Sequence, residues 1–368
     1  MRATALLCAC LLGTTVALAG EAAEPPTLEE KVGQMLMVGF RGLRLADDAT
    51  ILRDIRDRNL GGVVLYSFDV PSETPTRNVR DPDQLRRLVA HLRRAAPAAP
   101  LLIAVDQEGG SVRRLKSRFG FGPNSTAARF GALDDVERTA AYADRTAAAL
   151  VDVGINVNFA PVVDLDLNPN NPVIGAHGRS FGKSVEKVVR HALAVVRAHR
   201  ARRVITTLKH FPGHGSSEVD SHRGLPDITR TWKEAELAPF RRMLQNGACD
   251  AVMTAHLYNL ALDPDYPATL SRLTIDDVLR RDLGFDGVVF SDDMQMGAIS
   301  GNYGEARAVE LAIEAGVDIL VFANNSTYDE HVTERIITTV KSLINRGELD
   351  PALIDRAYQR ITQLKTRL

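Results

Sequence analysis

Short apolar runs alternate with longer amphipathic segments along most of the chain. Most of the runs are continuously apolar, which is typical of parallel strands covered on both faces. The predicted strands are residues 33–40, 62–66, 101–105, 157–163, 204–209, 251–256, 287–291 and 319–323.

Between these runs, apolar residues recur at the spacing that places them on one face of a helix. The predicted helices are residues 49–58, 82–95, 135–153, 185–201, 232–246, 275–283 and 303–315, and two more, 329–345 and 351–365, close the chain. Eight strands alternating with helices predict an α/β fold, a single (β/α)8 barrel of the TIM type with C-terminal helices. An open doubly wound sheet is disfavoured because the first strand, which ends in Val38 to Gly42, lacks the G-x-G-x-x-G spacing of a nucleotide site.

The first residues form a segment of a different kind. Arg2 precedes an apolar stretch over residues 3–16, and Ala17-Leu18-Ala19 follows the small-x-small cleavage pattern. We therefore predict a signal peptide at residues 1–19 and a periplasmic or secreted protein. An uncleaved anchor is the alternative, but the stretch is shorter than the ~20 apolar residues of a spanning helix. No later segment is long and apolar enough, so we expect no membrane span in the mature chain.

The composition narrows the classes of partner. Among 368 residues, 45 Lys and Arg oppose 46 Asp and Glu, which gives a formal net charge of −1. A nearly neutral protein has no long-range field to attract nucleic acid or anionic lipid. Beyond the leader only Cys249 remains, so no intrachain disulfide can form, and we expect a buried thiol without a chemical role.

Polar side chains follow six of the eight predicted strands. The C-terminal ends of barrel strands meet at one rim, where the active sites of this fold form. A rim rich in hydrogen-bonding groups suits a sugar, which needs several paired donors and acceptors to leave water. These strand ends carry Asp106-Gln107-Glu108, Asp164, Lys209-His210, His256, Asp292-Asp293 and Asn324-Asn325.

The segment after the fifth strand has the spacing of a metal site but not its context. His210 and His214 are four residues apart, which on a helix would place both on one face. Pro212 and the glycines on either side of His214 exclude a helix here. The first strand lacks the His-x-His of barrel metallohydrolases, and no Cys cluster is present. We therefore expect neither a catalytic metal nor a cofactor.

Asp220 and His222 indicate a chemical role more specifically than His210 and His214 do. An Asp beside a His can hold one imidazole nitrogen and raise the basicity of the other, as a proton shuttle near neutral pH requires. The pair lies in a segment, residues 211–231, that is long enough to act as a lid.

Five blocks, taken together, resemble glycoside hydrolase family 3, and within it the bacterial exo-β-N-acetylglucosaminidases of the NagZ type. They occur in the family's order and span the chain beyond the leader, which makes residues 26–368 one catalytic barrel. The combination of the third and fourth blocks is the most specific. The blocks are Val105 to Gly110, Gly178 to Gly182, Lys209 to Gly215, Asp220-Ser221-His222 and Gly284 to Met294.

The resemblance implies a role for each matching residue. Asp292 matches the nucleophile, and His222, paired with Asp220, matches the general acid/base. Asp293 and His214 are expected to organise loops. The residues that match those holding the sugar hydroxyls and the N-acetyl group are Asp106, Arg114, Arg179, Lys209 and His210.

The implied activity is the retaining hydrolysis of terminal β-linked N-acetylglucosamine through a covalent glycosyl-Asp intermediate. The substrates implied are β-GlcNAc oligosaccharides, either peptidoglycan fragments (muropeptides) or chitin oligosaccharides. Ser111 departs from the family's usual Arg, which puts contacts to the aglycone, the leaving part of the substrate, in doubt.

Three alternatives remain open. Another family activity, such as a β-glucosidase, would generally draw its acid/base from a second domain, and Asp220 with His222 fills that place here. A phosphorylase would replace water by phosphate, which a neutral His tolerates better than a carboxylate does. A non-catalytic glycan-binding protein of the cell envelope would be expected to have lost Asp292 or His222.

Overall fold

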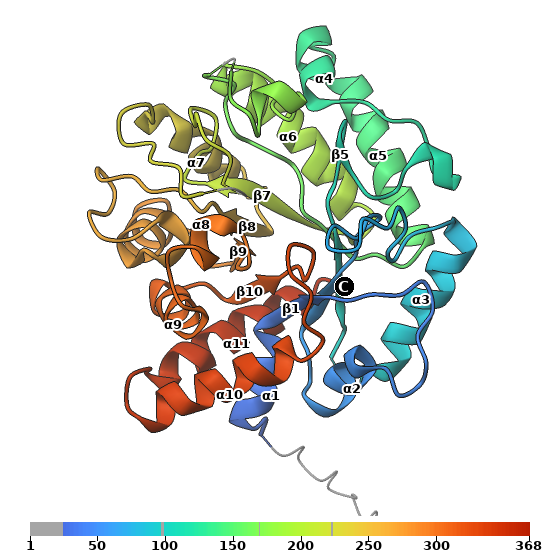
Figure 1. The fold of residues 1–368 in the computed structure, drawn as a ribbon. Helices are drawn as coiled ribbons and strands as arrows, with labels where there is room; N and C mark the ends of the chain where they lie inside the picture. Colours follow the sequence, from blue (N-terminus) through green and yellow to red (C-terminus); the bar gives the residue numbers. More distant parts are fainter. Residues whose placement is uncertain (1–24, 97–98, 169, 222–223) are drawn as a thin grey trace, which may run out of the picture.

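A closed barrel of eight parallel strands forms the centre of the protein (Figure 1), as the sequence predicts. The structure is a computed structural model that describes residues 25–96, 99–168, 170–221 and 224–368. The predicted signal peptide therefore lies outside the described residues. Around the barrel the strands follow the order β1-β10-β9-β8-β7-β6-β3-β2, and every neighbouring pair is parallel.

The barrel strands are short and completely buried over most of their length, because helices cover their outer faces and side chains fill the interior. They are β1 (Leu36–Gly39), β2 (Gly62–Val64), β3 (Leu102–Val105), β6 (Val157–Asn158), β7 (Ile205–Phe211), β8 (Ala251–Thr254), β9 (Val288–Asp293) and β10 (Ile319–Phe322).

Amphipathic helices surround the barrel and bury one face each against it. The longer ones are α2 (Thr50–Asp57), α3 (Pro82–Ala95), α5 (Val136–Asp152), α6 (Val185–Arg200), α7 (Ala238–Gln245), α9 (Glu305–Ala315), α10 (Val332–Asn345) and α11 (Pro351–Lys365). The sixth predicted helix is a π-helix, Leu273–Asp282, and two further helices, α4 (Ala127–Leu133) and α8 (Gly297–Ser300), are short.

The predicted first strand is wrong at its beginning. Residues 33 and 34 belong to a helix, α1 (Leu28–Gln34), and the strand starts only at Leu36. Thr27 and Glu30 start this helix, because each side chain accepts the backbone N–H of the other, at 3.2 and 2.7 Å. The Thr-x-x-Glu spacing of a helix start is present in the sequence. The apolar residues continue from the helix into the strand without a break, so the pattern does not show where one ends and the other begins.

The rim holds a second feature that periodicity does not predict. After β3 the chain forms an antiparallel hairpin of β4 (Gln107–Gly109) and β5 (Val112–Arg113). Gly109 and Gly110 make the turn possible, since both have positive φ, at 107° and 61°. The hairpin places Gln107 and Glu108 directly at the C-terminal end of the barrel.

At the opposite end, the two ends of the described chain close the barrel. Helix α1 packs against α10 and α11, so the first and last helices lie side by side (Figure 1). The Lys365 amine, from the end of α11, donates to Gln34 Oε1 at 2.6 Å and to the Gly61 carbonyl at 3.0 Å. These buried bonds join the end of α11 to the end of α1 and to the loop that precedes β2.

Among the described residues, no helix combines the length and the apolar character needed to cross a bilayer.

Candidate active site

A cavity of about 410 Å³ opens at the C-terminal ends of the barrel strands. Six residues predicted from the sequence to form the site line it, although they come from four separate strand ends and loops: Asp106, Arg114, Arg179, Lys209, His210 and Asp292. Of the predicted pair on the lid, His222 lies outside the described residues, and Asp220 is partly buried. Ser221, which stands between them in the sequence, lines the cavity.

Asp292 lies at the end of β9, with its side chain lining the cavity. Its Oδ1 atom accepts the backbone N–H of Asp293 at 2.8 Å. The Asp293 carboxylate is used differently, since its Oδ1 accepts backbone N–H groups of Gln295 at 3.1 Å and Ala323 at 3.0 Å. Asp293 thus fixes the loop after β9 to β10, and this backbone holds the neighbouring Asp292 carboxylate at the cavity.

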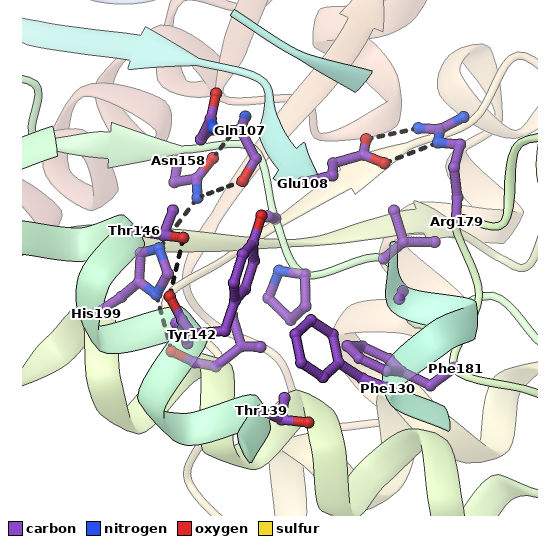
Figure 2. A pocket seen from close by; sticks show the side chains of 16 residues that line it. Gln107, Glu108, Phe130, Thr139, Tyr142, Thr146, Asn158, Arg179, Phe181 and His199 are labelled. Carbon is purple, nitrogen blue, oxygen red and sulfur yellow. Dashed lines mark hydrogen bonds and ion pairs between the residues drawn. The ribbon is translucent and has the colours of Figure 1, made fainter. Parts of the chain in front are cut away.

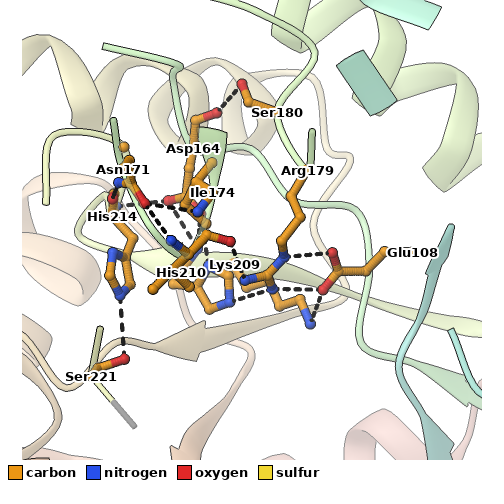
Figure 3. Close-up of polar contacts among 12 residues, drawn as sticks. Glu108, Asp164, Asn171, Ile174, Arg179, Ser180, Lys209, His210, His214 and Ser221 are labelled. Carbon is orange, nitrogen blue, oxygen red and sulfur yellow. Dashed lines mark hydrogen bonds and ion pairs between the residues drawn. The ribbon is translucent and has the colours of Figure 1, made fainter. Parts of the chain in front are cut away.

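Charged side chains of alternating sign form a continuous network across one wall of the cavity. Arg114 donates to Asp106 at 2.8 Å, and the buried Lys209 amine bridges Asp106 at 2.9 Å and Glu108 at 2.7 Å. Arg179 then binds both Glu108 oxygens, through Nε at 2.8 Å and Nη2 at 2.7 Å (Figure 3). This bidentate pairing holds the Arg179 guanidinium in one orientation.

The network keeps its members charged in spite of their burial. Burial opposes ionisation of Glu108, but Arg179 and Lys209 lower its pKa to about 2. For Asp106, burial is likewise outweighed by Lys209 and Arg114, which hold its pKa well below the usual range. Burial lowers the pKa of Lys209, and the two carboxylates more than reverse that effect. The wall therefore offers fixed charges and hydrogen-bonding groups to a polar ligand.

Asp164, at the end of the segment after β6, fixes His210 in one tautomer (Figure 3). Arg179 Nη2 lies 3.1 Å from His210 Nε2, and because an arginine can only donate, Nε2 must be the acceptor. Nδ1 therefore carries the proton and donates to Asp164 Oδ2 at 2.7 Å. Burial, followed by Arg179 and Lys209, lowers the pKa of His210 well below its ordinary value, so the ring is neutral.

His214 connects the same carboxylate to the predicted lid. Its backbone N–H donates to Asp164 Oδ1 at 2.8 Å, and its Nε2 lies 3.4 Å from the Ser221 hydroxyl. The Ser221 carbonyl accepts the backbone N–H of Ala298, in α8, at 3.3 Å. Ser221, which precedes His222 in the sequence, is thereby held between the segment that follows β7 and helix α8.

Three residues of the site were not assigned a role from the sequence. Glu108 and Asp164 were recognised only as polar strand ends, although they hold Arg179, Lys209 and His210 in place. Tyr66, at the end of the β2 segment, lines the cavity and has the Arg114 guanidinium 5.0 Å from its ring centre. The position of Glu108 inside the Asp-Gln-Glu block indicated that it lies at the site. Its partners could not be predicted, because Arg179 and Lys209 lie far from it along the chain.

A smaller cavity, of about 40 Å³, lies behind the network, between the barrel and helices α4, α5 and α6 (Figure 2). Figure 2 shows the Glu108–Arg179 pair at its edge, with Phe130 and Phe181 on the same side. The cavity is therefore lined by charged groups where it meets the ion pair and by apolar rings at Phe130 and Phe181.

Two other expectations concern reactive groups. Cys249 is partly buried, and burial raises the pKa of its thiol, so the thiolate that a nucleophile needs is disfavoured. Within the described ranges, no group of three or more His, Cys, Asp or Glu side chains is placed to hold a metal ion.

Comparisons with known proteins show the family of the chain. Residues 27–364 match the model of the glycosyl hydrolase family 3 N terminal domain. The chain is 39% identical over 295 residues to a β-hexosaminidase of Tolumonas auensis, and the match covers 79% of this chain and 83% of that protein.

Two solved structures are similar over nearly the whole chain. A glycoside hydrolase family 3 β-N-acetylglucosaminidase from Paenibacillus superposes with a TM-score of 0.83 at 37% identity, covering 93% of this chain and 63% of that one. A β-N-acetylhexosaminidase from Beutenbergia cavernae gives 0.82 at 32% identity, covering 93% and 99%. The chain thus spans less than two thirds of the Paenibacillus protein and almost all of the Beutenbergia one.

Proposed function

The chain belongs to glycoside hydrolase family 3, and from that premise we propose that it is a retaining exo-β-N-acetylglucosaminidase that removes terminal β-linked N-acetylglucosamine. The observation that carries the proposal is the cavity at the strand ends, where the Asp292 carboxylate lies among the charged residues Asp106, Lys209 and Arg179. The relatives named β-hexosaminidase and β-N-acetylglucosaminidase support the choice of sugar.

In this proposal Asp292 attacks the anomeric carbon and forms a glycosyl ester. A retaining enzyme places its nucleophile and its acid/base on opposite sides of the scissile bond, ~5 Å apart when both are carboxylates. The charged wall, including Arg179 and the neutral His210, would bind the sugar hydroxyls and the N-acetyl group and hold the anomeric carbon in line with Asp292.

His222 would protonate the departing oxygen and later remove a proton from the attacking water. A His needs less adjustment of its pKa for this work than a carboxylic acid, whose unperturbed pKa lies near 4. Asp220 would hold the imidazole in the required orientation. The position of Ser221, which contacts His214 and lines the cavity, supports a lid that brings its next residue toward the substrate.

Hydrolysis of nitrophenyl glycosides tests the choice of sugar. We expect the N-acetyl-β-glucosaminide to be cleaved with a kcat/KM far above that of the β-glucoside. Equal or better cleavage of the glucoside would reject the proposal. Adding phosphate and assaying for a sugar 1-phosphate separates a hydrolase from a phosphorylase in the same experiment.

Asp292→Asn tests the nucleophile. We expect kcat to fall by about 10³-fold or more in a variant that melts like the wild type, because no ester can form. A 5-fluoro glycosyl fluoride of N-acetylglucosamine should leave a covalent adduct on the peptide that contains Asp292. An adduct on another residue would displace Asp292 from this role.

His222→Ala tests the acid/base through its dependence on the leaving group. The loss should reach ~10²–10⁴-fold for a disaccharide, whose leaving alcohol needs a proton. Formation of the glycosyl-enzyme from a nitrophenyl glycoside should lose much less. The same loss for both leaving groups would argue against His222.

We further propose that the protein acts in the periplasm or outside the cell, after cleavage behind Ala19. The N-terminal sequence of the protein recovered from its native host should then begin at Gly20. Full-length protein that stays with the cytoplasmic fraction would contradict this.

A further inference from the structure

Tyr66 lines the catalytic cavity, yet none of the steps proposed above uses it. It lies two residues after β2, and the N–H of its neighbour Leu65 donates to the Ala104 carbonyl of β3 at 3.0 Å. Because β2 and β3 are parallel neighbours in the barrel, Tyr66 reaches the rim beside the end of β3, which Asp106 follows directly. Tyr66 and Asp106 therefore occupy adjacent positions on the rim.

The backbone of Tyr66 is held in place by Asn78. The Asn78 Oδ1 atom accepts the Tyr66 N–H at 3.0 Å, and the Tyr66 carbonyl accepts the Asn78 N–H at 2.9 Å. Asn78 is itself completely buried, and its Nδ2 donates to the Phe40 carbonyl at 3.0 Å. The Tyr66 side chain thus extends from a fixed point on the rim.

Two guanidinium groups fix the aromatic ring of Tyr66. The Cζ atoms of Arg114 and Arg77 lie over the ring, 5.0 and 5.7 Å from its centre, which is the range of a cation–π contact. Each cation is anchored in turn, since Arg114 pairs with Asp106 and the buried Arg77 pairs with Asp69, both at 2.8 Å. A ring oriented before the ligand arrives binds at a lower cost in conformational entropy than a mobile one.

The hydroxyl group at the end of this ring is a donor without a partner in the protein. It forms no hydrogen bond to any residue that the structure describes. Burial, followed by the charges of Asp106 and Asp293, raises the pKa of the Tyr66 phenol well above its ordinary value. The group therefore stays protonated and can donate one hydrogen bond to a ligand in the cavity.

We propose that the Tyr66 hydroxyl donates a hydrogen bond to a hydroxyl of the terminal sugar, and that the same sugar hydroxyl donates to Asp106. The inference rests on the proposed function and adds a substrate-binding residue to it. A sugar hydroxyl is both an acceptor and a donor, so a phenol and a carboxylate side by side satisfy both of its roles. Because Asp106 belongs to the wall that binds the cleaved sugar in that proposal, the contact is to this sugar and not to the aglycone.

The variant Tyr66→Phe keeps the ring and its contacts with the two cations and removes only the hydroxyl. We expect kcat/KM to fall about tenfold, and by the same factor on a nitrophenyl N-acetyl-β-glucosaminide and on N,N′-diacetylchitobiose, because the contact is to the sugar that they share. Tyr328→Phe is the matched control. The Tyr328 ring also lies 5.7 Å from Arg77 Cζ, but Tyr328 does not line the cavity, so this variant should keep wild-type kinetics.

Deoxy substrates test whether the bond goes directly to the sugar. Nitrophenyl N-acetyl-β-glucosaminides that lack the 3-, 4- or 6-hydroxyl are compared on the wild type and on Tyr66→Phe. The variant should cleave one of these analogues as well as the wild type does, because the bond is already missing, and should be slower on the other two by the same factor as on the parent substrate.

Three outcomes would overturn the inference: equal losses on all the deoxy analogues, no loss on the parent substrate, or a loss confined to chitobiose. The first would mean that the hydroxyl acts through the shape of the site, and the last would place its contact on the aglycone. Failure of the wild-type enzyme to cleave the parent substrate would instead reject the proposed function.

Discussion

At the scale of single residues, the site depends on a few buried charges whose partners come from other strands. Glu108 is the clearest case, because it binds two buried cations, Arg179 and Lys209, at once. Removing one member of such a group leaves the others buried and uncompensated, which costs far more than the intact pair contributes.

The variant Glu108→Gln keeps the shape and removes the charge. We expect the free energy of unfolding at pH 7 to fall by about 3 kcal/mol and kcat/KM to fall as Arg179 loses its orientation. The pKa of Glu108 is lowered to about 2, so its contribution is fully present above the unfolded pKa near 4.3 and is lost as the pH falls through 2. Urea unfolding at pH 7 and at pH 2.5 measures whether the difference between the two proteins shrinks.

Glu137→Gln, on the exposed side of α5, is the matched control and should change stability by less than about 0.5 kcal/mol. A Glu108→Gln variant as stable as the wild type at pH 7 would show that the ion pairs are not needed to hold the wall together.

At the scale of elements, the attachment of the lid to the barrel decides whether the acid/base can reach the substrate. The first part of residues 211–231 is fixed by side chains from outside it. Asn171 Nδ2 donates to the His214 carbonyl at 2.7 Å, and Trp232 Nε1 donates to the Pro212 carbonyl at 3.2 Å. Glu236, almost completely buried, accepts the Gly215 N–H through Oε2 at 3.0 Å.

Glu236→Ala removes the last of these bonds and should loosen the lid. We expect kcat/KM on a disaccharide to fall about tenfold, because proton donation depends on the position of the lid, and to fall much less on a nitrophenyl glycoside. Burial raises the pKa of Glu236 to about 7, so the neutral acid is accessible to it. Both carboxyl oxygens accept backbone N–H groups, of Gly215 at 3.0 Å and of Lys233 at 3.4 Å, and the single acceptor oxygen of a Gln can keep the shorter bond, to Gly215. Glu236→Gln should therefore retain nearly wild-type kinetics. Equal losses on the two substrates, or a Gln variant as poor as the Ala variant, would contradict this role for the lid.

At the scale of the whole molecule, closure of the barrel joins the two ends of the described chain through one buried amine. Lys365 donates to Gln34 Oε1 and the Gly61 carbonyl, and burial lowers its pKa to about 7. The folded protein therefore releases this proton near pH 7, while the unfolded chain holds it up to about pH 10.4. Between these values the unfolded state binds more protons, so the stability contributed by this group rises with pH across that window.

Lys365→Met removes this titration. We compare the free energies of unfolding as the value of the variant minus the value of the wild type. This difference should be largest at pH 7 and should fall by more than about 1 kcal/mol by pH 10, because only the wild type gains stability over this range. Urea unfolding at pH 7, 8.5 and 10 measures this, with Lys183→Met at an exposed position as the control. A difference that does not change with pH would mean that the amine stays charged in the folded state.

The sequence by itself determined the kind of fold and most of the positions at which chemistry can occur. Apolar periodicity depends on burial of one face at a time, so it predicts strands and helices locally, and eight alternations leave a closed barrel as the simplest arrangement. Strand ends meet at one rim in any such barrel, which is why Asp106, Lys209 and Asp292 could be expected together before their contacts were known.

Tertiary structure alone decided which of these groups touch and in what ionisation state. Glu108 meets Arg179 across 71 residues, and Lys365 meets Gln34 across 331, distances at which local patterns carry no information. The neutral Nδ1–H form of His210 follows from Asp164 on one side and Arg179 on the other. A pKa or a tautomer depends on the burial and charges around a group, and these exist only once the barrel has closed.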